Sequence, residues 1–379
     1  MTQEAQPAPQ TSLQRSSRDP ANVASRLTAW LTSVLPPGAE PEVSLELAAD
    51  SNGMSSETLP VTITHTADGM RRTDEYVARI APAPADVPVF PSYRLRDQYD
   101  AMRLAAQLTE VPVPRVWLIE ESGAVLGTPF FLMQRIAGIV PPDVLPYPFG
   151  GNWLYDAAPE EQQALQRRSV AVLAALHGIP NVAETFAFLD PAVAGHGGAS
   201  WLERNLAKTR AWYAFATEGG TRSPLIERGL AWLAANLPAD TEPVLVWGDA
   251  RIGNAMYREF TPVAVLDWEM ATLGPREMDV AWMIFAHEVF QNIATTFGLP
   301  GMPDFLRADD VRATYEELSG ATLGDLTWHR VHAAVQWACV FLRTSTRQVH
   351  FGEIDRPADA ESAFYHRALF ESLLDEVGA

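Results

Sequence analysis

The sequence of 379 residues has very little cysteine and lysine: Cys339 is its one thiol and Lys208 its one lysine. A single thiol excludes an intrachain disulfide and a metal site built from thiolates. Cys339 lies in the apolar stretch VQWACVFL, so we interpret it as a small buried side chain rather than a nucleophile. Because all other basic residues are arginines, any active-site role that usually falls to lysine falls to arginine here.

Long apolar runs are also missing from this sequence. No uninterrupted run approaches the roughly 20 residues that a membrane-spanning helix needs. The first residues, MTQEAQPAPQTSLQRSSRD, have neither the basic start nor the apolar block of a secretory signal. We therefore predict a cytoplasmic protein without membrane contact, whose residues 1–20 form a flexible leader.

Positive charge is scarce, and the formal net charge is −19. An acidic surface repels nucleic acid and anionic membranes, so binding to either through a basic face is disfavoured. The same surface would attract a cationic substrate, although acidic residues also keep many proteins soluble. Charge therefore excludes nucleic acid as a partner and leaves the oligomeric state open.

Hydrophobic residues make up 47% of the chain, which indicates two lobes or domains rather than one core. Alternating apolar residues predict five strands, at residues 43–48, 59–66, 73–80, 115–120 and 129–136. Helical spacing predicts helices at residues 22–34 and 93–108. We expect residues 21–137 to form an N-lobe with a five-stranded antiparallel sheet and one inserted helix.

The remainder of the chain, residues 138–379, has mainly helical patterns. The predicted helices lie at residues 160–177, 200–217, 224–236, 311–318, 328–348 and 358–376. Short β-type runs interrupt them at residues 244–246, 255–257 and 263–266. The predicted fold class is therefore α+β, with a small antiparallel β N-lobe on a larger helical C-lobe.

The most informative stretch is VLVWGDARIGNAMYREFTPVAVLDWEMATLGPREMDVAW, residues 244–282. Asp249 and Asn254 span a loop, and Asp267 ends the second strand of the hairpin that follows. Since a hairpin brings its far end back towards its start, we expect the three side chains to converge. A carboxylate can orient a substrate hydroxyl and take its proton, while an amide oxygen and a second carboxylate can hold Mg²⁺ against nucleotide phosphates. This set of residue types indicates phosphoryl transfer.

Three motifs in this stretch resemble those of the aminoglycoside phosphotransferase family, part of the protein-kinase-like superfamily. WGDARIGN resembles the family's catalytic loop, with Trp247 where the family often has histidine. LDWE resembles its metal-binding segment, and LGPREMDVAW resembles its downstream pattern with one extra residue before Asp279. The resemblance covers residues 40–370 and extends to the broad "phosphotransferase family" branch, which includes the kinase-like domain of certain acyl-CoA dehydrogenase fusion proteins.

The resemblance implies a bilobal protein-kinase-like fold and transfer of the γ-phosphoryl group of ATP to a hydroxyl. It makes Asp249 the catalytic base and Asn254 and Asp267 the Mg²⁺ ligands. Arg251, inside the catalytic loop, could neutralise the transferred phosphate. We interpret Asp279 as a residue that fixes the loop or starts a helix, and Glu269 as a structural or substrate contact, with a metal ligand as the alternative.

The N-lobe is expected to clamp the nucleotide. The turn between its first two strands resembles the family's phosphate loop, with Ser51, Gly53, Met54, Ser55 and Ser56 as contacts, although an ordinary hairpin loop fits this turn as well. Arg79, in EYVARI, stands where the family has the lysine that pairs with the α- and β-phosphates, with a surface arginine as the alternative. Gln98 stands where the family has that lysine's acidic partner, and its amide oxygen could accept a hydrogen bond from Arg79.

The strand at residues 130–136, followed by Gly138, resembles the hinge that joins the lobes in this family. Adenine is expected to bind there through backbone groups near Gln134 and Ile136, under the side chain of Met133.

The acceptor is not identified by these motifs. An unidentified small metabolite ranks first and an aminoglycoside second, while an apolar, aromatic cleft would favour a hydroxyacyl thioester or another lipophilic alcohol. A different class of function is also possible, that of a catalytically weak nucleotide-binding protein of the same fold. The departures at Arg79 and Gln98 favour this alternative. The intact set of Asp249, Asn254 and Asp267 argues against it. A protein-substrate kinase is disfavoured because no activation segment is recognisable after Asp267.

Overall fold

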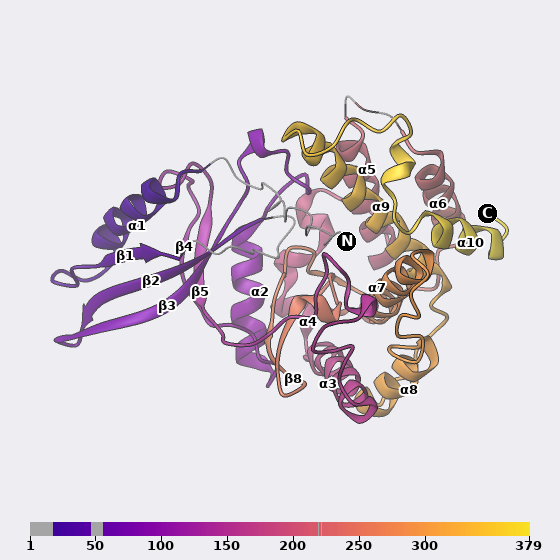
Figure 1. Ribbon diagram of the computed structural model, residues 1–379, viewed down its shortest axis with the longest axis horizontal. Helices are drawn as coiled ribbons and strands as arrows, with labels where there is room; N and C mark the ends of the chain where they lie inside the picture. The colour runs from indigo at the N-terminus through magenta and orange to yellow at the C-terminus, as the bar shows by residue number, and fades with distance from the viewer. Residues whose placement is uncertain (1–17, 47–55, 219, 221) are drawn as a thin grey trace, which may run out of the picture.

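A five-stranded antiparallel sheet and a helical body make up the two lobes of the chain, seen side by side in the computed structural model (Figure 1). The structure describes residues 18–46, 56–218, 220 and 222–379. The sheet has the order β1-β2-β3-β5-β4. Its strands are β1 (Glu42–Leu45), β2 (Glu57–Ala67), β3 (Met70–Ile80), β4 (Val116–Glu120) and β5 (Phe130–Gln134).

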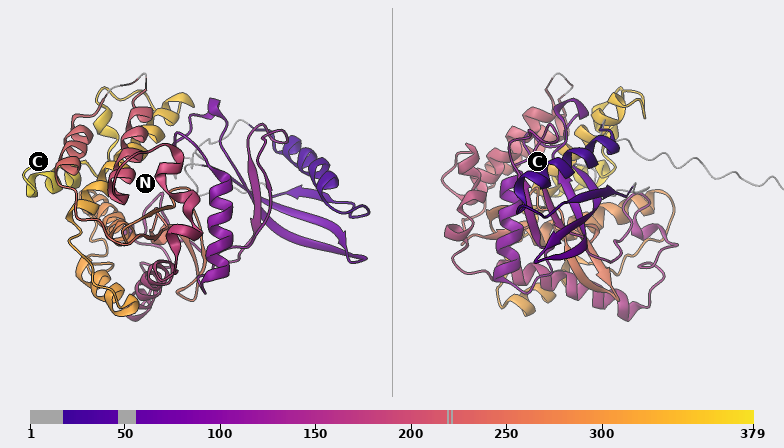
Figure 2. Two further views of the ribbon diagram at one scale, coloured as in Figure 1. Left: turned by 180° about the vertical axis from the view of Figure 1, so that it is seen from behind. Right: turned by 90° about the vertical axis from the view of Figure 1, so that its left-hand side faces the viewer.

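Two helices cover the two faces of this sheet. Helix α1 (Pro20–Val34) packs Leu27 and Leu31 against Ile63 and Ile80, forming an apolar cluster on the face turned away from the helical lobe (Figure 1). Helix α2 (Leu95–Leu108) packs on the opposite face, and its buried side chains join the core of the helical lobe. The sheet is thus held between α1 and α2, and α2 links it to the C-lobe (Figure 2).

The C-lobe is built from helices of widely different length. They are α3 (Pro159–His177), α4 (Val182–Thr185), α5 (Trp201–Ala216), α6 (Pro224–Ala235), α7 (Glu277–Thr296), α8 (Ala308–Ser319), α9 (Thr327–His350) and α10 (Arg367–Glu376). Short 3-10 turns lie at Pro84–Asp86, Tyr147–Phe149, Ala187–Leu189, Pro191–Ala194, Ile252–Asn254 and Ala360–Ala363. In the described part of the chain, no helix is both long enough and apolar enough to cross a membrane.

Two small antiparallel pairs lie inside this helical lobe. Strand β6 (Val244–Val246) pairs with β9 (Thr272–Gly274), and β7 (Ala255–Arg258) pairs with β8 (Thr261–Val265). The loop from β6 to β7 and the segment from β8 to β9 therefore both run from one strand pair to the other, which positions the residues of the candidate site.

The structure confirms the predicted α+β class, the five-stranded antiparallel sheet and the burial of Cys339. One helix prediction was wrong: residues 358–376 form a 3-10 turn at Ala360–Ala363 and a separate helix from Arg367, not one helix. Helix α7 was missed apart from the interpretation of Asp279 as a possible helix start. It is apolar on nearly every face and buried, so its sequence lacks the polar stripe that reveals a surface helix.

Candidate active site

The loop from β6 to β7 is fixed from beneath by helix α7. Asp279 in the first turn of α7 is fully buried and accepts hydrogen bonds from the backbone N–H groups of Trp247 at 2.7 Å and Gly248 at 2.8 Å. His177 of α3 lies 3.0 Å from the same carboxylate. Asp279 therefore lies where the sequence predicted a loop-fixing residue.

Gly248 allows this loop to pass close to the segment after β8. Its φ angle is +92°, and a Cβ atom there would lie 2.5 Å from the carbonyl oxygen of Met270. Any other residue would need both a strained backbone and a shift of that segment. Beside it, the buried indole of Trp247 donates to the carbonyl of Leu266 at 2.8 Å, so it joins the loop to the end of the β7–β8 hairpin.

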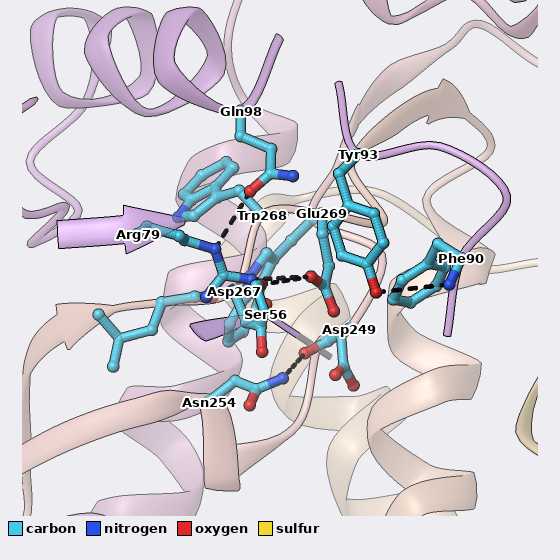
Figure 3. Close-up of polar contacts among 12 residues, drawn as sticks. Ser56, Arg79, Phe90, Tyr93, Gln98, Asp249, Asn254, Asp267, Trp268 and Glu269 are labelled. Atoms are coloured by element: carbon cyan, nitrogen blue, oxygen red, sulfur yellow. Dashed lines mark hydrogen bonds and ion pairs between the residues drawn. The ribbon is translucent and has the colours of Figure 1, made fainter. Parts of the chain in front are cut away.

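Asp249 lies next to Asn254 in the candidate site (Figure 3). Its Oδ1 accepts from the indole N–H of Trp282 at 2.8 Å and from Nε of Arg251 at 3.1 Å. The amide nitrogen of Asn254 donates to its backbone carbonyl at 3.0 Å. Burial raises the pKa of the Asp249 carboxyl, Arg251 opposes this rise, and the nearby carboxylate of Asp267 adds to it.

Arg251 is held between two carboxylates. Besides Asp249, its guanidinium forms an ion pair with Asp143, and both side chains are largely buried. Burial alone would lower the pKa of Arg251, but Asp143 and Asp249 outweigh it and raise that pKa. Arg251 therefore remains charged, and its place in the loop is set by Asp143.

Asp267 follows β8 with a φ angle of +61°, in the left-handed region that few non-glycine residues adopt. Such backbone conformations cluster at functional sites, where the surrounding structure holds them. Just before Asp267, Leu266 donates its backbone N–H to the carbonyl of Asn254 at 2.8 Å. The hairpin thus brings Asp249, Asn254 and Asp267 together, as the spacing predicted.

Arg79 reaches this group of residues from β3 (Figure 3). Its Nη2 lies 2.5 Å from Asp267 and 2.8 Å from Glu269, and its Nε donates to the amide oxygen of Gln98 at 3.3 Å. Burial alone would lower the pKa of Arg79, but the two carboxylates more than offset it and raise that pKa. Arg79 is therefore a buried cation joining the sheet to the C-lobe, and the surface-arginine alternative is wrong.

The predicted nucleotide contacts are only partly covered by the structure. Ser51, Gly53, Met54 and Ser55 lie outside the described residues. Ser56, at the start of that region, donates its hydroxyl to Glu269 at 3.2 Å.

The strand predicted to serve as the hinge ends at Gln134. Met133 is buried, and the backbone N–H of Gln134 donates to the carbonyl of Arg115 at 2.8 Å. Ile136 follows β5 and is half-buried. The N–H of Gln134 is thus already engaged within the N-lobe, as is that of Arg135, which donates to the carbonyl of Glu75 at 3.2 Å.

Two residues of this site were missed from the sequence, Trp282 and Asp143. Trp282 stands three residues after Asp279, one helical turn away on the same face of α7, which would have indicated that it faces the loop. Asp143 lies far from the motif in a proline-rich stretch, and no local pattern connects it to Arg251.

Comparison with known proteins identifies relatives of this chain. The sequence profile of the "Phosphotransferase enzyme family" matches residues 47–320, more than half of the chain. A probable acyl-CoA dehydrogenase, IBR3, from Arabidopsis thaliana is 28% identical over 229 residues, which cover 55% of this chain and 26% of the relative. Acyl-CoA dehydrogenase family member 11 from Gallus gallus is 30% identical over 199 residues, covering 52% and 23%. The chain thus spans about a quarter of the length of these relatives.

Solved structures share the fold at low sequence identity. A protein from Ralstonia eutropha JMP134, provisionally named an aminoglycoside phosphotransferase, superposes with a TM-score of 0.61 at 22% identity, covering 93% of this chain and 97% of its own. A thermostable mutant of aminoglycoside phosphotransferase APH(4)-Ia, in a ternary complex with AMP-PNP and hygromycin B, superposes with a TM-score of 0.51 at 15% identity, covering 93% and 99%. Both structures show the bilobal kinase-like fold.

Proposed function

Because the chain belongs to the phosphotransferase enzyme family, we propose that it transfers the γ-phosphoryl group of ATP to a hydroxyl of a small molecule, with Mg²⁺ as cofactor. The observation that carries the proposal is the convergence of Asp249, Asn254 and Asp267 around one loop and one hairpin. Phosphoryl transfer needs side chains that position the reactants and neutralise charge, and it needs no protein nucleophile. The carboxylate and amide groups of these three residues can fill those roles.

Asp249 acts as the catalytic carboxylate in this proposal. Trp282 and Arg251 both donate to Oδ1, so Oδ2 is the oxygen left to accept the proton of the acceptor hydroxyl. The raised pKa of Asp249 makes it a stronger base than a surface aspartate once it is ionised. Arg251 adds positive charge close to the position of the transferred phosphate.

Asn254 and Asp267 fit a Mg²⁺ ion by the chemistry of their donor atoms. The amide nitrogen of Asn254 is turned to the backbone of Asp249, so its oxygen is the end available to a cation. Among the residues that the structure describes, no three histidine, cysteine or acidic residues gather to hold a metal without other ligands. This suits Mg²⁺, which one or two carboxylates commonly hold together with substrate phosphates and water. The ion would neutralise charge on the β- and γ-phosphates.

Arg79 supplies the N-lobe contact to the α- and β-phosphates in this proposal. Its guanidinium already lies beside Asp267 and Glu269, so phosphate oxygens of a bound nucleotide would take the place of Asp267 while Glu269 keeps Arg79 in position. The ternary complex of APH(4)-Ia with AMP-PNP and hygromycin B supports a nucleotide and an acceptor bound together in this fold.

The test is a thermal unfolding measurement with and without Mg-ATP, followed by turnover. A ligand at about 100 times its Kd should raise the free energy of unfolding by about 2.7 kcal/mol. Turnover would then be followed by ADP release across aminoglycosides, other amino alcohols and hydroxyacyl thioesters. The proposal fails if neither ATP nor another nucleotide shifts the unfolding temperature in the presence of Mg²⁺.

A further inference from the structure

A pocket lies beside the candidate site, between α2, α5 and the segment that follows Asp267. Its walls are largely apolar and aromatic, with Phe90, Trp212, Trp268 and Met270 among the lining residues. Gln98 and Glu269, both contacts of Arg79, form part of the same lining. The pocket is therefore continuous with the residues proposed to bind the nucleotide.

The charged side chains that line this pocket are not all paired. Asp97 is paired with Arg94, whose Nε lies 2.8 Å from its carboxylate, and Glu269 is paired with Arg79. Lys208 of α5 also lines the pocket, and within the described ranges it forms no ion pair or hydrogen bond with any residue. Asp97 and Glu269 are thus each bonded to an arginine, with Arg79 shared between Glu269 and Asp267, while among the described residues the ammonium group of Lys208 forms no ion pair of its own.

His196, the remaining titratable group of the lining, adds no second unpaired cation, because burial lowers its pKa and favours its neutral form. Burial and the nearby Arg94 lower the pKa of Lys208 to about 8, against the opposing effect of Asp97. Lys208 is therefore still mainly protonated at pH 7. A half-buried cation that lacks a partner is costly unless a ligand supplies the counter-charge.

A second, smaller cavity connects Lys208 to the catalytic loop. It shares Lys208, Met270 and Gln336 with the first pocket and reaches Gly248 and Trp282. Gly248 precedes Asp249 in the loop, and the indole of Trp282 donates to the Asp249 carboxylate at 2.8 Å. Lys208 thus stands between the apolar pocket and the residues that hold the proposed catalytic base.

We propose that this pocket binds the acceptor, and that Lys208 pairs with an anionic group on an alcohol with an apolar body. This inference rests on the proposed function and narrows its acceptor class. Trp212 and Trp268 would contact the apolar body, and Lys208 would pair with a carboxylate or a similar anion. A polycationic acceptor such as an aminoglycoside would meet Lys208 and Arg94 without a free carboxylate to receive it.

Three alcohols of nearly equal shape and different charge test the proposal. Mandelate carries a carboxylate, mandelamide a neutral amide and 2-amino-1-phenylethanol an ammonium group, each beside the same ring and hydroxyl. Isothermal titration of the full chain should give a Kd for mandelate at least about tenfold below that of the other two, the range expected for a charge-assisted contact. Lys208→Met should abolish this preference, while Lys208→Arg should retain it. Equal binding of the three, no binding of mandelate, or a preference that survives Lys208→Met would each overturn the proposal.

The unsubstituted chain provides a second measurement, in case Lys208→Met does not fold. Because Lys208 is the one lysine, limited acetylation has one side-chain amine to modify, and the N-terminal amine serves as an internal standard. Mandelate should slow acetylation of Lys208 several-fold relative to the N-terminal amine, and mandelamide should not. Equal protection by both compounds would contradict the proposal. Mg-ATP binding is measured separately, so a missing nucleotide shift would defeat the proposed function and leave the charge preference as its own result.

Discussion

Arg79 of β3 and Glu269 of the segment after β8 form an ion pair, with 2.8 Å between Nη2 and Oε2. The same nitrogen lies 2.5 Å from Asp267, and α2 contributes the neutral Gln98 in place of a carboxylate. The acidic partner of the N-lobe cation therefore comes from the proposed metal-binding segment instead of from the helix.

Moving the acidic partner of Arg79 from position 269 to position 98 tests whether Glu269 positions Arg79. Glu269→Gln should weaken Mg-ATP binding by about 1–3 kcal/mol, because Arg79 loses a charged partner and is less well positioned. Adding Gln98→Glu should restore much of that loss, because it places a carboxylate on the other side of Arg79. Isothermal titration of the two single variants and the double variant gives the coupling energy. A double variant no better than Glu269→Gln would show that Glu269 acts elsewhere, for example on the metal.

Asp249→Asn should separate binding from chemistry. The amide keeps the shape of the side chain but cannot take a proton, so phosphoryl transfer should fall by about 10²–10⁴-fold. The Mg-ATP shift in unfolding temperature should remain within error of the parent. In the unsubstituted chain, the raised pKa of Asp249 should place the acid limb of kcat at a higher pH than a surface aspartate would. Turnover retained by the variant would show that another residue is the base.

Asp267→Ala should make nucleotide binding nearly independent of Mg²⁺. The substitution removes a proposed metal ligand but leaves Arg79 its ion pair with Glu269. We expect the stabilisation by ATP to become similar with Mg²⁺ and with EDTA, as measured by thermal unfolding. Asp304→Asn, on the exposed surface, serves as the control and should keep the full Mg²⁺ effect. An undiminished Mg²⁺ effect in Asp267→Ala would remove that residue from the proposed metal site.

Asp279→Asn should cost about 3 kcal/mol or more of unfolding free energy. The fully buried carboxylate accepts from Trp247 and Gly248 and contacts His177, and an amide would turn a donor towards one of these groups. Urea unfolding measures the loss against the parent. Asp304→Asn makes the same chemical change on the surface and should stay within about 0.5 kcal/mol. A similar small effect for Asp279→Asn would mean that the loop is held by other contacts.

The pH dependence of stability should be set largely by buried histidines. Burial lowers the pKa of His287, His329 and His366 to about 4 and that of His332 to about 3, from about 6.5 in an unfolded chain. Between these values the unfolded chain binds more protons than the folded one, so stability is complete above about pH 6.5 and falls towards pH 4. The raised pKa of Asp249 acts in the opposite direction and offsets part of this loss.

The slope of this loss can be measured by urea unfolding from pH 7 to pH 4.5. Four histidines correspond to about 5 kcal/mol per pH unit at the steepest point, before the offset by acidic groups. His332→Gln should lower the slope by about one proton and still allow a contact to Thr209, whose hydroxyl lies 2.8 Å from the ring. A stability that is flat over this range would show that these histidines are protonated in the folded chain.

The sequence predicted the parts of the site that depend on local geometry. A loop followed by a hairpin sufficed to bring Asp249, Asn254 and Asp267 together, and the expected contact between Gln98 and Arg79 is present at 3.3 Å. The pairing of Arg79 with Glu269 joins residues 190 positions apart and has no local signal. Lys208 stood out in the sequence as the one lysine, but its unpaired place in a pocket depends on how α2 and α5 pack.

Helix α7 carries both Asp279 and Trp282. Asp279 accepts hydrogen bonds from the backbone of the β6–β7 loop, and Trp282 donates a hydrogen bond to the carboxylate of Asp249. One helix of the C-lobe therefore positions both the β6–β7 loop and the carboxylate of Asp249. Arg79 belongs to β3, so any displacement of the sheet would separate it from Asp267 and leave the contacts of Asp249 with α7 unchanged. The proposed base and the proposed phosphate-binding cation are therefore positioned independently of each other.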